Sequence, residues 1–67
     1  MTPQEFKEAR RSLGLTLDQL GGMLGYSGEH VKAQVHKMET GERPVRSVQA
    51  RLMQCYLEGY RPDDWST

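Results

Sequence analysis

The side chains with the widest choice of chemistry lie in the middle of the chain. Both histidines, His30 and His36, fall in the stretch from residue 30 to residue 54. The same stretch holds five cations, Lys32, Lys37, Arg43, Arg46 and Arg51, against two carboxylates, Glu39 and Glu42. Imidazoles can ligate metals or transfer protons, and cationic groups can donate hydrogen bonds to anions. Three kinds of site therefore have to be weighed: a metal centre, a catalytic centre and a surface for an anionic partner.

A metal centre and a catalytic centre both fit the spacing poorly. His30 and His36 miss the i, i+4 spacing that lets two imidazoles on one helix chelate one ion, and Cys55 is the only cysteine. No nucleophile, base and orienting group are spaced for one cleft, and so small a chain rarely encloses one. We therefore expect no metal, no other cofactor, no small-molecule substrate and no enzymatic activity.

The overall charge restricts the anion-binding interpretation to a local surface. Nine Lys and Arg residues balance nine Asp and Glu residues, so the formal net charge is zero. This balance argues against a general polyanion binder. The tail from Glu58 onward is acidic, with Asp63 and Asp64 as its other carboxylates against Arg61. The excess of positive charge therefore lies in the middle of the chain.

The 67 residues predict one domain, residues 1–67, with no room for a second. A chain of this size buries only about 60% of its unfolded surface, so we expect a partner subunit to add to its stability. Cys55 alone cannot form an intramolecular disulfide, and a lone thiol favours a reducing compartment. No signal-like start and no apolar run of about 20 residues is present, so we expect a cytoplasmic protein without membrane contact.

Capping residues predict the first two helices. Thr2 and Glu5 have the spacing of a capping box, and Thr16 and Gln19 repeat it. Gly14 and Gly25 are suited to ending the two helices. The expected apolar faces are Phe6, Ala9 and Leu13 in the first helix, and Leu17, Leu20, Met23 and Leu24 in the second.

Two further helices follow. With Ser27 as its cap, we expect the third to run to Met38 or Glu39, ended by Thr40 and Gly41. Its expected buried stripe is Val31, Val35 and Met38. A fourth helix is predicted from about Arg46 to Glu58, with Val48, Leu52, Cys55 and Tyr56 along one side. The prediction is an all-α fold, a compact bundle of four to five helices.

The connection between the second and third helices suggests a specific motif. About three residues around Tyr26 join them, and so short a turn makes two helices cross steeply, as in a helix-turn-helix. The crossing needs a very small residue in the second helix, and Gly21 stands there. Because Gly21 and Gly22 each cost about 1 kcal/mol relative to Ala, at least one should have a packing reason. The alternative is a loosely wound helix in an ordinary small bundle.

Two runs carry a family resemblance. The run GLTLDQLGGMLGYS at residues 14–27 and the run VHKMETGERPV at residues 35–45 resemble the phage-repressor and Cro-type helix-turn-helix family, which is xenobiotic-response-element-like. The resemblance covers residues 3 to about 46. It implies a lambda-repressor-like bundle whose third helix lies in the major groove of double-stranded DNA.

The chain departs from the family pattern in two places. Counted from Ser27, the ending at Gly41 arrives four residues later than in a typical member. We expect this to lengthen the recognition helix by one turn, about 6 Å. Leu17 stands where the family commonly has a Gln that contacts a phosphate. That contact should be absent or supplied by another group.

The expected contacts divide into base-reading and phosphate-binding side chains. A register anchored at Val31 makes the base readers Glu29, His30 and Ala33, and one anchored at Val35 makes them Lys32, Ala33, Gln34, His36 and Lys37. The alternative for each is a solvated helix face. The expected phosphate contacts are Ser27, Arg43, Arg46, Arg51 and Arg11. The resemblance implies that Arg10 pairs with Glu39 as a structural ion pair.

Apolar residues near the carboxyl end suggest a partner subunit. We expect the segment of about 47–67 to serve dimerisation through Leu52, Tyr56, Leu57, Tyr60 and Trp65. The alternative is that Trp65 folds back over the core of its own chain. A two-fold dimer would recognise an inverted-repeat operator.

These features predict a sequence-specific, homodimeric transcriptional repressor of phage or mobile-element origin that regulates its own operon. Its size suits a Cro-like regulator, an antitoxin-type repressor or an anti-CRISPR-associated repressor, and nothing in the residues separates the three. The alternative function is an antitoxin-type protein-binding module that neutralises a partner protein.

Overall fold

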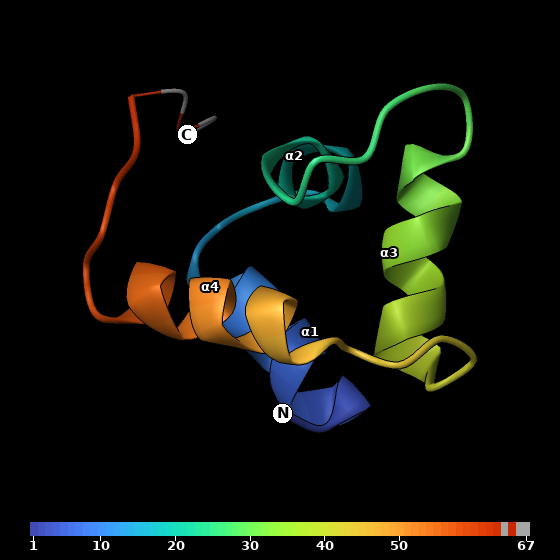
Figure 1. The fold of residues 1–67 in the computed structure, drawn as a ribbon, viewed down its shortest axis with the longest axis horizontal. Helices are drawn as coiled ribbons and strands as arrows, with labels where there is room; N and C mark the ends of the chain where they lie inside the picture. The colour runs from blue at the N-terminus through green and yellow to red at the C-terminus, as the bar shows by residue number, and fades with distance from the viewer. Residues whose placement is uncertain (64, 66–67) are drawn as a thin grey trace.

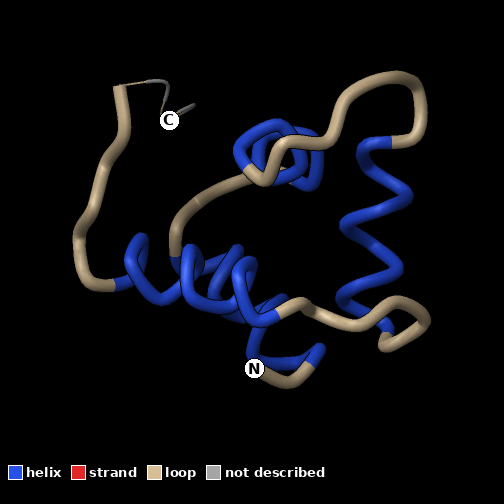
Figure 2. The backbone as a smooth tube through the Cα atoms, viewed as in Figure 1, coloured by secondary structure: helices blue, strands red, loops and turns tan. Residues whose placement is uncertain are grey.

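The computed structural model of the chain describes residues 1–63 and 65. The described residues form four helices and no strand: α1 (Pro3–Ser12), α2 (Leu17–Met23), α3 (Val31–Thr40) and α4 (Ser47–Leu57) (Figures 1 and 2). In Figure 1, α4 lies in front of α1, α2 is seen end-on above them, and α3 stands along one edge of the molecule. The described residues therefore confirm the prediction of a compact all-α fold with four helices.

The first two helices begin at the predicted capping boxes. The Glu5 backbone N–H donates to the Thr2 hydroxyl over 3.1 Å, and the Thr2 N–H donates to the Glu5 carboxylate over 2.8 Å. Thr16 and Gln19 form the same reciprocal pair over 3.1 and 2.9 Å. The hydrogen bond from the Thr2 backbone holds the pKa of the Glu5 carboxyl below its usual value. Local side-chain chemistry therefore sets both starting points.

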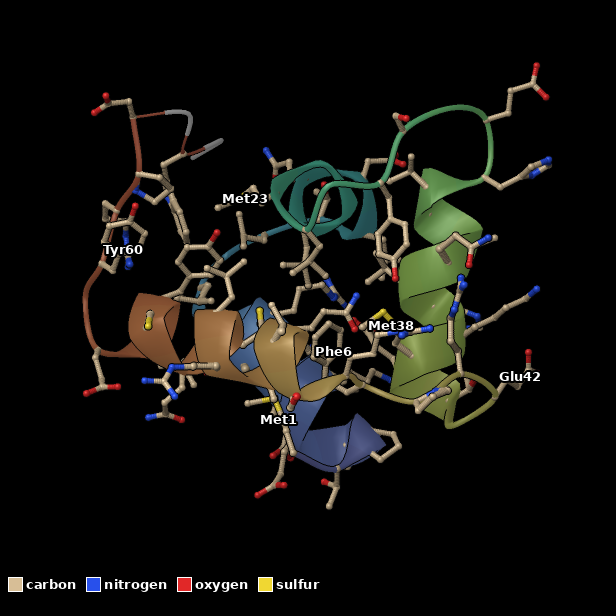
Figure 3. All side chains as sticks on the ribbon, viewed as in Figure 1. Met1, Phe6, Met23, Met38, Glu42 and Tyr60 are labelled. Atoms are coloured by element: carbon tan, nitrogen blue, oxygen red, sulfur yellow. The ribbon has the colours of Figure 1, made fainter. Side chains whose placement is uncertain are left out.

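One core joins α1, α2, α3 and α4. Phe6 of α1 and Met38 of α3 are fully buried and project toward the interior (Figure 3). In α3 the predicted stripe is confirmed, since Val35 and Met38 are fully buried and Val31 is half-buried. The buried apolar residues are Phe6, Ala9, Leu15, Leu20, Val35, Met38, Met53 and Tyr56.

The start of α3 differs from the prediction. The helix begins at Val31, not after Ser27, and residues 24–30 form the connection from α2. Gly28 has a φ of +95°, in the left-handed region, which a right-handed helix cannot contain. The expected short turn and the expected extra helical turn were therefore both wrong. The additional residues lengthen the connection, and α3 has 10 residues.

The inward side of α4 also differs from the prediction. Val48 is 77% exposed and Cys55 is exposed, whereas Met53 and Tyr56 are buried. Positions 49, 52, 53 and 56 follow the i, i+3, i+4, i+7 spacing of one helix face. The expected stripe through Val48 and Cys55 was wrong because this other face, centred on Met53, packs against the core.

Candidate functional site

The outward face of α3 carries the side chains with the chemistry expected of a recognition surface. At 100° per residue, the buried residues Val35 and Met38 leave an opposite arc of about 140° facing solvent. That arc is lined by Lys32, His36, Thr40, Ala33 and Lys37, all of them exposed. Figures 1 and 2 show no other helix on the outer side of α3. We call these five residues the α3 outer face.

The predicted base readers fall into three structural settings. Lys32, Ala33, His36 and Lys37 all belong to the α3 outer face. Glu29 and His30 are exposed in the connection that precedes α3. Gln34 is half-buried, and its Oε1 atom is buried without a hydrogen-bond partner among the described residues.

Gly21 allows α2 to approach the inner side of α3 closely. A Cβ atom at this position would overlap Val31 Cγ1 and would lie 3.2 Å from Val35 Cγ2. A Cβ atom on Gly22 would meet nothing within 4 Å. The prediction of a packing reason is therefore confirmed at Gly21, while Gly22 has none. In Figure 1 the axis of α2 points toward the viewer and that of α3 stands upright in the plane of the picture, so the two helix axes are steeply inclined to each other.

A buried ion pair connects α1 to the last turn of α3. Arg10 Nε donates to Glu39 Oε2 over 2.6 Å, and Arg10 Nη2 donates to Glu39 Oε1 over 3.3 Å. Arg10 Nη1 also donates to the Leu15 carbonyl over 2.9 Å. The Glu39 side chain is only 3% exposed, so the bidentate partner offsets the cost of burying its charge. The pair implied by the family resemblance is thus present and holds α3 against α1.

Sequence reasoning missed a second polar anchor, formed by Tyr26 and Gln49. Gln49 Nε2 donates to the Tyr26 hydroxyl over 2.9 Å, and that hydroxyl donates to Met38 Sδ over 3.9 Å. Gln49 Oε1 also accepts from the Arg46 backbone N–H over 3.1 Å at the start of α4. The Tyr26 side chain therefore fastens the α2–α3 connection to α3 and α4. The spacing of Gln49 three residues after Arg46 suggests a helix start, but no signal in the sequence links Gln49 to Tyr26.

The predicted phosphate-binding residues do not all share one surface. Arg43 and Arg46 lie in the connection that follows α3, and the Arg43 backbone N–H donates to the Lys37 carbonyl over 3.1 Å. The Arg43 guanidinium carbon is 5.8 Å from the centre of the Tyr26 ring. Ser27 is exposed in the connection before α3, and Arg11 is exposed in the last turn of α1.

Arg51 lies elsewhere. It borders a shallow depression between α1 and α4, together with Met1, Glu5 and Gln54. Of the predicted phosphate set, Ser27, Arg43 and Arg46 lie in the connections on either side of α3.

One ion pair lies at the amino-terminal end of the α3 outer face. Lys32 Nζ is 3.8 Å from Asp18 Oδ2, which belongs to the first turn of α2. Both side chains are about two-thirds exposed, at 66% and 64%. The neighbouring Leu17 packs against the core and offers no polar group for a phosphate. The surface next to the start of α3 is therefore neutralised within the protein.

Three aromatic residues near the carboxyl end pack on one another within the chain. Tyr56 is only 3% exposed, and the Trp65 ring meets it edge-on at a centroid distance of 5.1 Å. Tyr60 stacks on Tyr56 at 6.1 Å, and the Arg61 guanidinium carbon lies 4.2 Å from the centre of the Trp65 ring. Trp65 thus folds back over its own chain, which was the alternative expectation.

The assignment of Tyr56 as an interface residue is corrected, because its side chain belongs to the core. Leu57 and Tyr60 remain 42% and 55% exposed, and Leu52 is half-buried. Of the expected dimerisation segment, residues 64, 66 and 67 lie outside the described residues.

Within residues 1–63 and 65, no three His, Cys, Asp or Glu side chains are grouped in a way that could hold a metal ion. No helix in the described part of the chain is long and apolar enough to cross a membrane. No protein-family model, no curated protein and no solved structure matches this chain. Among the described residues, the α3 outer face and the side chains that hold α3 in place are the features with the clearest functional chemistry.

Proposed function

We propose that this chain is a sequence-specific DNA-binding transcriptional regulator in which α2 and α3 form a helix-turn-helix. The observation that supports it is the α3 outer face, an uncovered polar helix surface along one edge of the molecule. The major groove is wide enough for one α-helix, and its base edges match polar side chains on that helix. The Gly21 contact holds α3 close to α2, and the Arg10–Glu39 pair holds it against α1.

The position of α3 favours the register anchored at Val35. Residues near the amino end of a recognition helix usually read the bases, and α3 begins at Val31. Lys32 and Lys37 suit guanine O6 and N7, His36 suits a base or a phosphate, and Ala33 suits a thymine methyl group. Gln34 would turn its amide outward to reach an adenine. Glu29 and His30 precede the helix and would lie at the edge of the groove.

The proposed phosphate contacts are made by residues in the connections before and after α3. Arg43 and Arg46 lie in the connection from α3 to α4, and Ser27 lies in the connection before α3. Contacts of this type fix the position of the helix on the duplex without reading sequence. Arg11 and Arg51 would contribute through the general field of the protein.

The proposed working form is a homodimeric repressor bound to an inverted-repeat operator. Two copies related by a two-fold axis would place their α3 helices about one DNA turn apart, roughly 34 Å. Leu52, Leu57 and Tyr60 retain apolar surface that a second copy could cover. Binding would block polymerase at the chain's own promoter, as suits a cytoplasmic regulator of phage or mobile-element origin without enzymatic activity.

A selection experiment tests the proposal. Purified protein is used to enrich duplexes from a random pool, and the affinity for an enriched and a scrambled duplex is measured by fluorescence anisotropy at two salt concentrations. We expect an affinity ratio of at least about 10³ and a steep decrease in both affinities with salt. Sedimentation of the complex should show two chains for each inverted repeat. Failure to enrich any sequence, or equal affinity for both duplexes, would contradict the proposal.

A further inference from the structure

Asp18 places a carboxylate beside the surface that we propose to bind DNA. It lies in the first turn of α2, and Gly21, one turn later, lies against Val31 at the start of α3. Its side chain is 64% exposed, and its Oδ2 atom is 3.8 Å from Lys32 Nζ. A phosphate that binds Lys32 would therefore have to compete with Asp18 for the same ammonium group.

The energetics of this pair favour a readily exchanged contact. Exposed ion pairs at such distances contribute little to stability, so Asp18 has little value as a structural partner. As a negative charge in the first turn of α2 it also interacts favourably with the helix dipole. Asp18 should affect DNA binding more than stability, because the affinity for DNA depends on how many cations remain to neutralise phosphates.

We propose that Asp18 restrains DNA binding by neutralising Lys32, so that the chain holds unselected DNA weakly. This inference depends on the proposed function and deepens it. Of the cations on the α3 outer face, Lys32 is compensated within the protein and Lys37 carries no such ion pair among the described residues. The restraint agrees with the zero net charge of the chain, which limits binding to duplexes that also satisfy the base readers.

The test is a double-mutant cycle with Asp18→Asn and Lys32→Met, measured on the scrambled duplex over a range of salt concentrations. Asp18→Asn keeps the shape of the side chain and removes its charge, and Lys32→Met keeps the apolar stem. We expect Asp18→Asn to raise the affinity about tenfold at low salt and to steepen the log–log salt slope by about one. In the Lys32→Met background the same change should have almost no effect, because the cation that it releases is gone.

Glu58→Gln is the matched control. It also removes one negative charge, at the end of α4 on the opposite side of the molecule from α3 (Figure 1). Its effect on the salt slope should be well below that of Asp18→Asn. Thermal unfolding of every variant establishes that the fold is kept.

The outcomes separate this inference from the proposed function. An unchanged salt slope in Asp18→Asn, or a gain that persists without Lys32, overturns the restraint while leaving DNA binding intact. An equal gain from Glu58→Gln also overturns it, because the effect would then come from net charge alone. If the unaltered chain binds neither an enriched nor a scrambled duplex, the proposed function fails and the restraint fails with it.

Discussion

The α3 region and the carboxyl-terminal region differ in whether their candidate functional side chains are exposed or packed within the chain. Around α3, buried contacts lie behind the helix and the outer face stays open: Gly21 and Glu39 are buried, while His36 and Lys37 are exposed. At the carboxyl end, Tyr56 and Trp65 pack against each other within one chain. Side chains held from behind remain available for a partner, whereas side chains that pack together stabilise their own fold. The α3 region is therefore the better candidate for recognition.

The largest expected effect comes from breaking the support of α3. Arg10→Ala leaves the Glu39 carboxylate buried without its cation, and we expect a loss of about 3–5 kcal/mol in the free energy of unfolding. Urea unfolding followed by circular dichroism measures it. The double variant Arg10→Met with Glu39→Met should recover much of the loss, because neither charge is then buried. A loss below about 1 kcal/mol in Arg10→Ala would show that the pair does not hold α3.

The contact between α2 and α3 provides a matched pair of substitutions. Gly21→Ala should destabilise the protein by about 1–3 kcal/mol, because the new methyl group overlaps Val31. Gly22→Ala should instead stabilise it by up to about 1 kcal/mol, because that position is open and Ala favours a helix. Melting temperatures of the two variants should shift in opposite directions. Shifts of the same sign would contradict the close approach of the helices.

The division between base reading and phosphate binding can be sharpened with Lys37 and Arg46. We expect Lys37→Ala to cost about 1–3 kcal/mol in binding an enriched duplex and to change the preferred sequence in a repeated selection. Arg46→Ala should weaken binding to all duplexes alike and reduce the salt slope by about one. Both variants should keep the circular dichroism spectrum of the original chain. Equal loss of preference in both would refute the division of roles.

The smallest expected effect concerns the start of α1, which lies outside both regions. The pKa of Glu5 is lowered from its usual value of 4.5, mainly by the backbone hydrogen bond from Thr2. A depressed pKa in the folded state means that the carboxylate stabilises the fold above its unfolded pKa and loses this effect as the pH falls through the lowered value. Between pH 5 and about pH 3, Glu5→Gln should therefore lose less stability than the original chain. If thermal unfolding shows the same loss of stability with falling pH in Glu5→Gln and in the original chain, the Glu5 carboxylate does not make this contribution.

Local chemistry could be predicted from the sequence and the packing between helices only in part. The capping boxes at Thr2 and Thr16 depend on neighbouring residues, so spacing alone located them. The start of α3 could not be placed in the same way. Ser27 has the side chain of a helix cap, but Gly28 adopts a left-handed backbone conformation, so no helix can begin directly after Ser27.

The remaining differences arise from tertiary contacts that no periodicity reports. The rotation of α4 depends on Met53 filling the core, and the Tyr26–Gln49 bond joins residues that are distant in the sequence. The position of Trp65 over Tyr56 likewise requires the folded core to exist first. Within the candidate site, Lys32, Ala33, His36 and Lys37 are exposed, in agreement with the expected outward face. Gln34 is half-buried, so it lies at the border between the outward face of α3 and the protein interior.

The most direct test of the central claim is a map of amide chemical shifts on adding an enriched duplex to isotope-labelled protein. The account predicts that the largest changes occur in residues 29–40, with further changes at Arg43 and Arg46, and that residues 54–60 of α4 and its end change little. Changes concentrated along α4, with α3 unaffected, would contradict the claim that the α3 outer face enters the DNA groove.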